Sequence, residues 1–308
     1  MKPLRHFLTL ADVDVDELKL ILARAEEIKA DFKKGARVQR LEGKILGMIF
    51  EKMSLRTRVS FEAGMTHLGG SSMLLEEKHI GLGTRESVPD VSRVLSSMVD
   101  CITFRAYKHE TVQEFAKYSS VPVINALTDK AHPCQALADM FTVKEEFGSF
   151  NDVQITWVGD SNNVAASLIE TCAMLGCKIV ISSPKGYQFS AQELAELTAQ
   201  RQPGFELELI DDPKEAVLDA RVVYTDVWVS MGDEKEEGER VATFKPYQVN
   251  AELMSLARPD AIFLHCLPAR RGLEVTDEVI DSPQSRVIEE AANRMHAQKG
   301  LLVWLFEG

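Results

Sequence analysis

The sequence contains 308 residues with a mass of 34.4 kDa, which is enough chain for two domains of ordinary size. With 45% hydrophobic and 27% charged residues, it has the composition of a globular protein and not of a disordered or fibrous one. Its 47 acidic and 35 basic residues leave a net charge of −12. A protein with this net charge repels nucleic acid and anionic membranes at long range, which excludes binding driven by overall charge. Any phosphate that it binds therefore needs a local basic cluster.

Nothing in the sequence predicts a membrane segment, and we expect a cytoplasmic protein. No apolar run approaches the roughly 18 residues that span a bilayer, and the apolar stretch near Phe7 ends at Asp12, too soon for a signal peptide. The cysteines lack the paired spacing of a disulfide framework or a zinc site, so we expect free thiols. They are Cys101, Cys134, Cys172, Cys177 and Cys266.

The first half of the chain begins with a helix and then alternates between short apolar runs and amphipathic helices. Asp14 and Glu17 have the spacing of a capping box, and apolar residues recur after them at helical intervals up to Phe32. The remaining elements predicted here are strands at 45–50, 101–104 and 121–125, a helix at 54–68 closed by Gly69 and Gly70, and a helix around 91–98.

The same alternation resumes after a long helix predicted from His132 to Phe147. Further strands are predicted at 155–158, 178–181, 222–224 and 261–264, with a helix ending at Leu175 and a last apolar helix at 291–306. The predicted fold class is α/β, with two domains, each a parallel sheet flanked by helices, joined by long helices. We expect one domain at 1–131, with the C-terminal helix of about 286–308 packed back on it, and the other at 132–285.

The segment from Phe50 to Arg58 joins a buried strand to a helix and predicts an anion site. A helix N-terminus presents N–H groups without intrahelical partners and a positive dipole end, to which Ser54, Arg56 and Thr57 add polar side chains. The simpler interpretation is a serine N-cap followed by solvated arginines.

Other polar residues come directly after predicted strands, where open α/β sheets bind their ligands. Arg105, Asp226 and His265-Cys266 each stand at the end of a strand, and His132 opens the long helix. Alone, each has an ordinary explanation: a surface arginine, a core cysteine or a capped helix start. Their shared position favours a functional site.

Residues 157–164 join a strand to a helix as the phosphate-binding turn of a dinucleotide fold does. Of the three glycines in G-x-G-x-x-G only Gly159 is present, with Ser161 and Val164 in the other places, which argues against a nicotinamide cofactor. The pair Asn162-Asn163 can cap the helix or bind a small carboxylate.

Asp226 is followed by Ser230-Met231-Gly232 and then by a strongly charged run to Arg240. The charged run alone predicts a solvated loop, while the glycines at 232 and 238 also fit a hinged lid. An aspartate at a strand end beside Cys266 suits a substrate amine, which needs a counter-charge and must lose a proton.

Four motifs together resemble those of the ornithine carbamoyltransferases, and the resemblance extends over essentially the whole chain. They are Ser54-Leu55-Arg56-Thr57-Arg58, His132-Pro133-Cys134-Gln135, Asp226-x-x-x-Ser230-Met231-Gly232 and His265-Cys266-Leu267-Pro268. Relatives that use aspartate lack the last two motifs, so the resemblance implies ornithine as the acceptor. The alternative is an N-acylated ornithine or another amine, because relatives acting on N-acylated ornithine also resemble the first motif.

The resemblance implies particular residues for each substrate. Those that bind carbamoyl phosphate would be Ser54, Leu55, Arg56, Thr57, Lys78, Arg105, His132, Gln135, Cys266, Leu267 and Arg294. Those that bind ornithine would be Asn163, Asp226, Ser230 and Met231, and the catalytic residues would be Arg105, His132, Asp226 and Cys266. It also implies no metal, no cofactor, and a homotrimer with active sites at subunit interfaces.

Two positions depart from the family pattern. Leu55 stands where most members have threonine, which removes a hydroxyl and keeps the backbone N–H. Lys78 aligns best with a glutamine that reaches carbamoyl phosphate from a neighbouring subunit. Two other hypotheses stay open: a dinucleotide-dependent oxidoreductase, for which glycines are missing, and a catalytically inactive homologue, which would be expected to have lost some of the catalytic residues.

Overall fold

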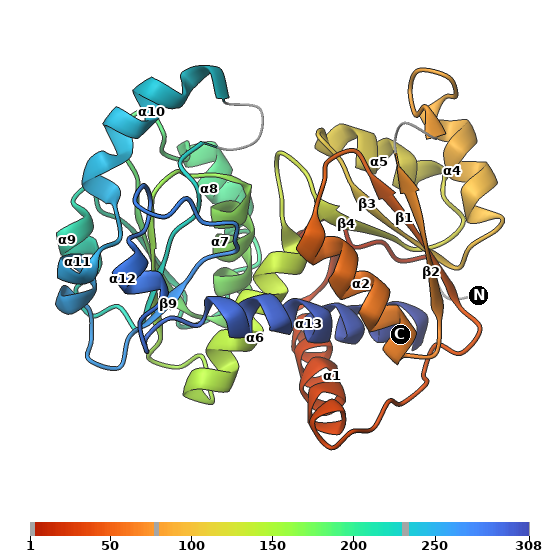
Figure 1. Ribbon diagram of the computed structural model, residues 1–308, viewed down its shortest axis with the longest axis horizontal. Coiled ribbons are helices and arrows are strands. Elements are labelled where there is room, and N and C mark those ends of the chain that lie inside the picture. The colour runs from red at the N-terminus through yellow and green to blue at the C-terminus, as the bar shows by residue number, and fades with distance from the viewer. Residues whose placement is uncertain (1–3, 77–79, 230–233, 308) are drawn as a thin grey trace. The chain divides into compact units, whose positions relative to one another are not determined.

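Figure 1 shows the computed structural model, in which residues 4–76, 80–229 and 234–307 are described. The chain divides into two compact units: unit 1 comprises Met1–Phe141 and Ala292–Gly308, and unit 2 comprises Thr142–Ala291. Both division points fall inside helices, α6 (Pro133–Phe147) and α13 (Val287–Glu307), so each of these helices contributes residues to both units.

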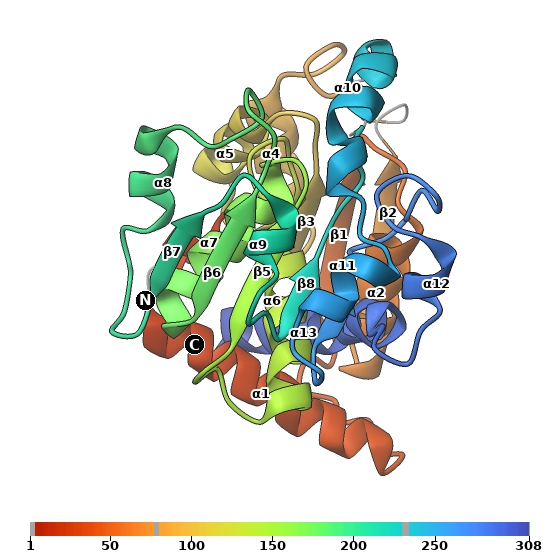
Figure 2. The ribbon, with the colours of Figure 1, turned by 90° about the vertical axis from the view of Figure 1, so that its left-hand side faces the viewer.

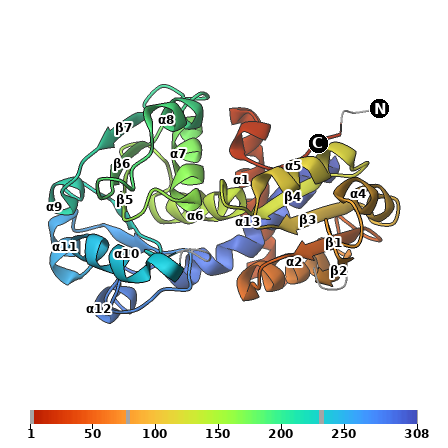
Figure 3. The ribbon, with the colours of Figure 1, turned by 90° about the horizontal axis from the view of Figure 1, so that it is seen from above.

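Unit 1 is built around a parallel sheet. Its other described elements are the 3-10 helix η1 (Leu10–Asp12), α1 (Val15–Lys33), β1 (Ile45–Phe50), α2 (Leu55–His67), β2 (Ser71–Glu76), α4 (Val88–Ser96), β3 (Cys101–Arg105), α5 (His109–Tyr118) and β4 (Val123–Leu127). The described strands pair in parallel in the order β2-β1-β3-β4, as the alternating pattern predicts. Figure 3 shows α5 on one side of this sheet and α2 on the other.

The start of α1 confirms the predicted capping box. The Glu17 N–H donates to Asp14 Oδ1 at 2.8 Å, and the Asp14 N–H donates to Glu17 Oε2 at 3.1 Å. Two N–H groups at the helix start are therefore satisfied by side chains. The apolar face predicted for this helix is buried from Leu18 to Ile28.

The topology of unit 1 creates a position where ligands bind in open sheets. From β1 the chain passes through α2 to β2 on one side, and then crosses to β3 on the other side of β1. The connections therefore diverge at the carboxyl ends of β1 and β3, where Phe50 is paired with Arg105. The start of α2 and Arg105 lie at this switch point.

Unit 2 contains a second parallel sheet. Its other described elements are β5 (Gln154–Val158), α7 (Asn163–Leu175), β6 (Lys178–Ser182), α8 (Ala191–Leu197), β7 (Glu206–Leu209), α9 (Pro213–Ala216), β8 (Val222–Tyr224), η2 (Glu234–Glu236), α10 (Glu237–Phe244), η3 (Lys245–Tyr247), α11 (Ala251–Leu256), β9 (Ile262–Leu264) and α12 (Asp277–Ile280). Figure 2 looks toward this sheet, whose described strands pair in parallel in the order β7-β6-β5-β8-β9. Val223 and Phe263 of the sheet share a buried apolar cluster with Leu253 of α11 and Val279 of α12.

The switch point of unit 2 lies between β5 and β8. From β5 the chain moves through β6 to β7 on one side, and it later returns to β8 and β9 on the other. The segments after these strands carry Asn162 after β5, Asp226 after β8 and Cys266 after β9. This edge of the sheet therefore gathers the polar residues that the sequence singles out in this half of the chain.

Two expectations drawn from composition can be compared with the structure. The cysteines are free thiols, as expected, and all are buried except the half-buried Cys266. Among the helices of the described ranges, none is both long enough and apolar enough to cross a bilayer.

Candidate functional site

The start of α2 provides the first part of a candidate anion site in unit 1. The Ser54 hydroxyl accepts a hydrogen bond from the Thr57 N–H at 3.2 Å, so Ser54 is the N-cap. The other N–H groups of a first helical turn have no intrahelical acceptor and give the helix end a partial positive charge. The apolar Leu55 side chain is 75% exposed, so this residue offers a ligand only its backbone N–H.

Four of the expected binding residues are joined by hydrogen bonds in unit 1. Arg294 Nη2 donates to Thr57 Oγ1 at 2.7 Å. Its Nη1 donates to Gln135 Oε1 and lies 3.3 Å from His132 Nε2. Gln135 Nε2 donates in turn to Asp139 Oδ1 at 2.7 Å. All these side chains are buried, so residues of α2, α13 and the start of α6 form one fixed cluster.

Positive charge dominates the surroundings of His132. Burial, followed by the charges of Arg294 and Arg105, holds the pKa of His132 well below its usual value, so the ring is neutral near pH 7. Since a guanidinium can only donate, His132 Nε2 accepts from Arg294 and the ring proton is assigned to Nδ1. Arg105 is 7% exposed, so this unit gathers two buried guanidinium groups near its switch point.

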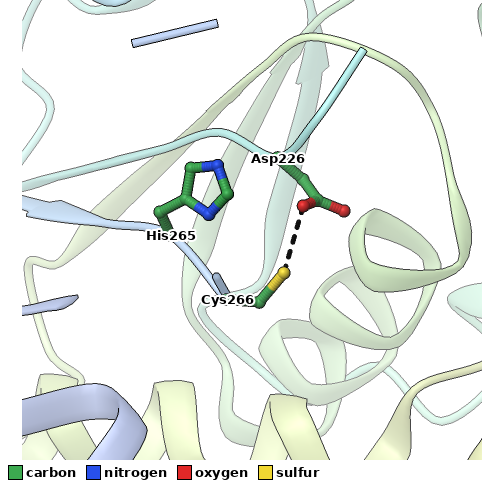
Figure 4. A group of neighbouring side chains, drawn as sticks. All are labelled: Asp226, His265 and Cys266. Atoms are coloured by element: carbon green, nitrogen blue, oxygen red, sulfur yellow. Dashed lines mark hydrogen bonds between the residues drawn. The ribbon is translucent and has the colours of Figure 1, made fainter. Parts of the chain in front are cut away.

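The candidate site of unit 2 is centred on Asp226 (Figure 4). Cys266 Sγ donates to Asp226 Oδ1 at 3.1 Å, and Asn162 Nδ2 donates to Asp226 Oδ2 at 2.9 Å. Asp226 is 8% exposed, whereas Cys266 is half-buried. An acidic side chain held by an amide and a thiol thus lies at the switch point of this sheet.

His265 makes a separate set of hydrogen bonds. Its Nδ1 accepts from the Leu267 N–H at 2.9 Å, and its Nε2 lies 3.2 Å from Glu274 Oε1. Glu290 Oε2 accepts from the His265 backbone N–H at 3.0 Å. The buried ring therefore fixes the segment through Leu267, which has a φ of 54° and precedes a cis bond to Pro268.

Asp226, His265 and Cys266 also form a group in the described residues with the proximity of metal ligands, since one donor atom from each lies within 4.8 Å of the others. A zinc site needs an imidazole nitrogen with a free lone pair. Both ring nitrogens of His265 are engaged, Nδ1 by Leu267 and Nε2 by Glu274. The donor set therefore fits a hydrogen-bonded cluster better than a metal centre.

The turn after β5 confirms the capping interpretation for one member of the asparagine pair. Asn162 Oδ1 accepts from the N–H groups of Val164 and Ala165 at 2.9 and 3.1 Å, so Asn162 is the N-cap of α7 and Asn163 is its first residue. Gly159 has a φ of 138°, a conformation that L side chains rarely adopt. The backbone alone accounts for this glycine, without a pyrophosphate.

The end of the predicted lid is anchored within unit 2. Arg240 of α10 forms a partly buried ion pair with Asp160, and its Nε donates to the Trp228 carbonyl oxygen at 2.6 Å. Its guanidinium carbon lies 4.8 Å from the centre of the Tyr187 ring.

Three of the expected binding residues lie outside the described residues: Lys78, Ser230 and Met231.

Two family models together match almost the whole chain. The aspartate/ornithine carbamoyltransferase carbamoyl-P binding domain matches residues 5–145, and the Asp/Orn binding domain of the same family matches residues 151–305. The chain belongs to the aspartate/ornithine carbamoyltransferase family. Within this carbamoyltransferase, the switch point of unit 1 lies in the first matched segment and that of unit 2 lies in the second.

Members of the family resemble the chain over nearly their full length. An ornithine carbamoyltransferase of Bacillus subtilis is 52% identical over 301 residues, which is 97% of this chain and 92% of that protein. The solved ornithine carbamoyltransferase from Pyrococcus furiosus has a TM-score of 0.94 at 47% identity, covering 99% of this chain and 97% of that one. The anabolic ornithine carbamoyltransferase from Campylobacter jejuni has a TM-score of 0.92 at 40% identity, covering 99% of each chain. These matches confirm the predicted resemblance and the α/β fold.

Sequence reasoning missed several side chains of this carbamoyltransferase. Asp139 stands four residues after Gln135, a helical spacing that could have indicated their contact. Lys52 is 9% exposed, and its pKa is lowered by burial and by Arg105, so it adds a cation close to that arginine. The contact between Asn162 and Asp226 joins residues 64 positions apart, and no local pattern could have revealed it.

Proposed function

We propose that the protein is an ornithine carbamoyltransferase, an enzyme that transfers the carbamoyl group of carbamoyl phosphate to the δ-amine of L-ornithine and releases L-citrulline and phosphate. The named relatives support this activity, and the anabolic Campylobacter jejuni structure supports a role in arginine biosynthesis. The observation that carries the proposal is the opposite charge of the two sites: buried arginines in unit 1 suit an anionic donor, and Asp226 in unit 2 suits an amine. No metal or cofactor is part of the proposed reaction, and a cytoplasmic location stays a prediction.

Unit 1 binds carbamoyl phosphate in this proposal. The phosphate group occupies the N-terminus of α2, because backbone N–H groups and the helix dipole favour an anion there. The Arg294 guanidinium, already tied to Thr57 and Gln135, presents its charge next to this helix end. The donor-binding residues of unit 1 are Ser54, Leu55, Arg56, Thr57, Arg105, His132, Gln135 and Arg294.

Arg105 and His132 act on the carbonyl oxygen of the donor. During attack, negative charge develops on this oxygen, and donors that are already in place stabilise it without reorganisation. Arg105 supplies a permanent positive charge and the neutral His132 supplies a hydrogen bond. Cys134 belongs to the same motif as His132. It is not a nucleophile in this scheme, since burial raises the pKa of its thiol to about 12.

Unit 2 binds L-ornithine through Asn163, Asp226, Ser230 and Met231. The δ-amine has a solution pKa close to that of lysine, about 10.4, so most of it arrives protonated near pH 7. Asp226 attracts the ammonium group and accepts one of its protons, which frees the lone pair that attacks the carbonyl carbon, while Cys266 orients the amine. The tetrahedral intermediate then breaks its C–O bond to phosphate, and the departing phosphate takes the second proton from the nitrogen. Cys266 and Leu267 also contact the carbamoyl group.

Substrate binding is ordered in this scheme, with carbamoyl phosphate first. The segment 230–240 closes after ornithine enters and keeps water away from a donor that hydrolyses. Arg240 fixes the far end of this segment through Asp160 and Trp228. Calorimetric affinity for ornithine should rise when an unreactive analogue of carbamoyl phosphate is present. Equal affinity with and without the analogue would contradict the order.

One assay tests the proposed activity against its alternatives. The enzyme is incubated with carbamoyl phosphate and, separately, with L-ornithine, N-acetyl-L-ornithine, putrescine or L-aspartate, and the carbamoylated product is measured. We expect citrulline from ornithine to dominate. A higher rate with N-acetylornithine or putrescine would assign a different acceptor, and no product with any amine would favour the catalytically inactive homologue. Nicotinamide binding by fluorescence tests the oxidoreductase alternative.

The proposed assembly is a homotrimer with active sites at subunit interfaces, in which Lys78 reaches the carbamoyl phosphate of a neighbouring subunit. Lys78→Ala and Arg56→Ala would then damage the same site from different chains. Refolding the two impaired variants together should restore activity above either parent, because some mixed trimers contain one undamaged site. If Lys78→Ala is impaired and mixing never exceeds the average of the parents, Lys78 acts within its own chain.

A further inference from the structure

Asn162 uses both ends of its side-chain amide, and the two ends do different work. Its Oδ1 accepts the N–H groups of Val164 and Ala165 at 2.9 and 3.1 Å, which caps α7. Its Nδ2 donates to Asp226 Oδ2 at 2.9 Å. The same rigid amide therefore connects the end of a helix to the carboxylate at the centre of the unit 2 site.

Capping alone does not require an asparagine at this position. Asparagine, aspartate and serine cap helices about equally well, since each supplies an oxygen acceptor. Only the amide also supplies an N–H donor, and Asp226 uses this donor. Because α7 holds Oδ1 at two points, the direction of the Nδ2–H bonds is fixed by the helix.

Asp226 is 8% exposed, so the orientation of its carboxylate depends on protein donors. Asn162 engages Oδ2 and Cys266 engages Oδ1, which sets the plane of the group from both sides. A carboxylate that must face a substrate amine loses efficiency when it rotates. We propose that Asn162 is a positioning residue for the reaction, which uses the N-terminus of α7 as a fixed support to aim the Asp226 carboxylate. This inference rests on the proposed role of Asp226 toward ornithine.

The decisive variant is Asn162→Asp, which keeps the cap and replaces the N–H donor by a second carboxylate. At low pH the two carboxylates can share one proton, which reproduces both the hydrogen bond and the net charge of the natural pair. As the pH rises, that proton leaves and the carboxylates repel each other. We expect kcat/KM for ornithine to be near the natural value at pH 6 and to fall about 100-fold below it by pH 8.5. A reduction of kcat/KM in Asn162→Asp that is the same at pH 6 and pH 8.5 would overturn the proposal.

Two further variants separate positioning from stability. Asn250→Asp makes the same change at the N-cap of α11 in the same unit, where Asn250 Oδ1 accepts from the Leu253 N–H at 2.9 Å, and it should leave the pH profile unchanged. Asn162→Ser keeps a capping oxygen and replaces the amide N–H donor by a shorter hydroxyl without adding charge, so kcat/KM should fall about tenfold at every pH, with an unchanged affinity for carbamoyl phosphate. Natural kcat/KM in Asn162→Ser would overturn the proposal.

A readout without turnover keeps this test independent of the proposed function. Cys266 is the half-buried thiol, whereas the other cysteines are buried, so alkylation of the folded protein by iodoacetamide reports on it. A second carboxylate beside Asp226 disfavours the thiolate, and we expect about fivefold slower alkylation at pH 8 in Asn162→Asp than in Asn250→Asp. Equal rates would overturn the inference even if the enzyme made citrulline. If natural enzyme made no citrulline and the rates still differed, the proposed function alone would fail.

Discussion

The two candidate sites occupy the same place in their sheets, yet they are built for opposite charges. In unit 1 the capping Ser54 accepts one N–H of α2, so this helix end retains positive character at the switch point. In unit 2 the capping Asn162 accepts two N–H groups of α7 and presents its own donor to Asp226. The two units therefore share the position of the switch point, while the capping side chain and its neighbours give each site a different charge.

The histidines of the two sites follow the same contrast. Burial and the charges of Arg294 and Arg105 hold the pKa of His132 low, so this histidine stays neutral among cations. His265 has Glu274 at its Nε2 and the Leu267 N–H at its Nδ1, so a carboxylate and a backbone donor fix its ring. The first histidine therefore lies in a basic cluster, whereas the second fixes the segment that contains Leu267.

The largest effect is expected when the acidic centre of unit 2 is neutralised. Asp226→Asn should lower kcat/KM for ornithine by about 10³-fold, because the amine loses its counter-charge and its proton acceptor. Carbamoyl phosphate affinity, measured by calorimetry, should change far less, since the phosphate-binding residues of unit 1 are intact. Asp260→Asn is the control, because Asp260 forms a surface ion pair with Arg221. Ornithine use at natural efficiency in folded Asp226→Asn would contradict the assignment.

The corresponding change in unit 1 removes a cation from the start of α2. Arg56→Ala should weaken carbamoyl phosphate binding by about 100-fold, the loss expected for a charge-assisted bidentate contact. Titration of the folded variant measures this directly. Arg93→Ala is the matched control, since Arg93 is an exposed arginine of α4 paired with Asp90 at 3.5 Å. Unchanged affinity in Arg56→Ala would remove this arginine from the site.

Much of the fold could be predicted because buried strands and capped helices leave strong local signals. The predicted strands 45–50 and 222–224 coincide with β1 and β8, and the capping box at Asp14 starts α1. The edge strands β2 and β7 were not among the predicted elements. β7 has the sequence Glu-Leu-Glu-Leu and is largely exposed, so it lacks the continuous apolar run of a central strand. The strand predicted at 121–125 begins later, at Val123, because Val121 belongs to a turn closed by Ser119.

Some features of the candidate site could likewise be predicted from neighbouring residues, whereas others depend on contacts between residues far apart in the sequence. The cap at Ser54 and the placement of Arg105 and Asp226 at strand ends follow from short sequence patterns and from topology. The partners of these residues come from far along the chain: Arg294 contacts Thr57 across 237 positions, and Cys266 contacts Asp226 across 40. The helix predicted around 91–98 is present as α4 (Val88–Ser96), and its apolar residue Val94 is 57% exposed.

A smaller effect is expected when the thiol of unit 2 is replaced by a hydroxyl. Cys266→Ser should reduce kcat/KM for ornithine by about tenfold, because a hydroxyl can still donate to Asp226 but with different length and polarity. Turnover should persist, since the amine attacks carbamoyl phosphate directly and no acyl-enzyme is needed. Mass spectrometry of the enzyme during turnover checks the second point. A carbamoyl-thioester trapped on Cys266 would refute it.

The smallest expected effect concerns acid stability, where the two units differ because of their histidines. Burial is the largest cause of the lowered pKa of each of the unit 1 histidines with a resolved shift, which are His6, His67, His109, His132 and His296. For His296 the pKa falls to about 3. An unfolded histidine has a pKa near 6.5, so below that pH the unfolded chain binds protons that the folded unit does not. Each such group therefore lowers the stability of unit 1 as the pH falls from about 6.5 toward its folded pKa. Unit 2 has His265 as its single histidine in the sequence.

Hydrogen exchange measured by mass spectrometry at pH 7 and pH 5, corrected for intrinsic rates, should therefore show protection falling severalfold more in unit 1 peptides than in unit 2 peptides. His296→Gln should reduce this difference, because it removes one proton-binding group and leaves a polar side chain next to Phe32, whose ring lies 5.1 Å from that of His296. Above about pH 7.5 the natural and variant proteins should show the same pH dependence, since the histidines are then almost entirely neutral in both the folded and the unfolded state. An equal loss of protection in both units would mean that acid destabilises them through carboxylates, which occur throughout the chain. The larger number of histidines in unit 1 would then have no effect on its acid stability.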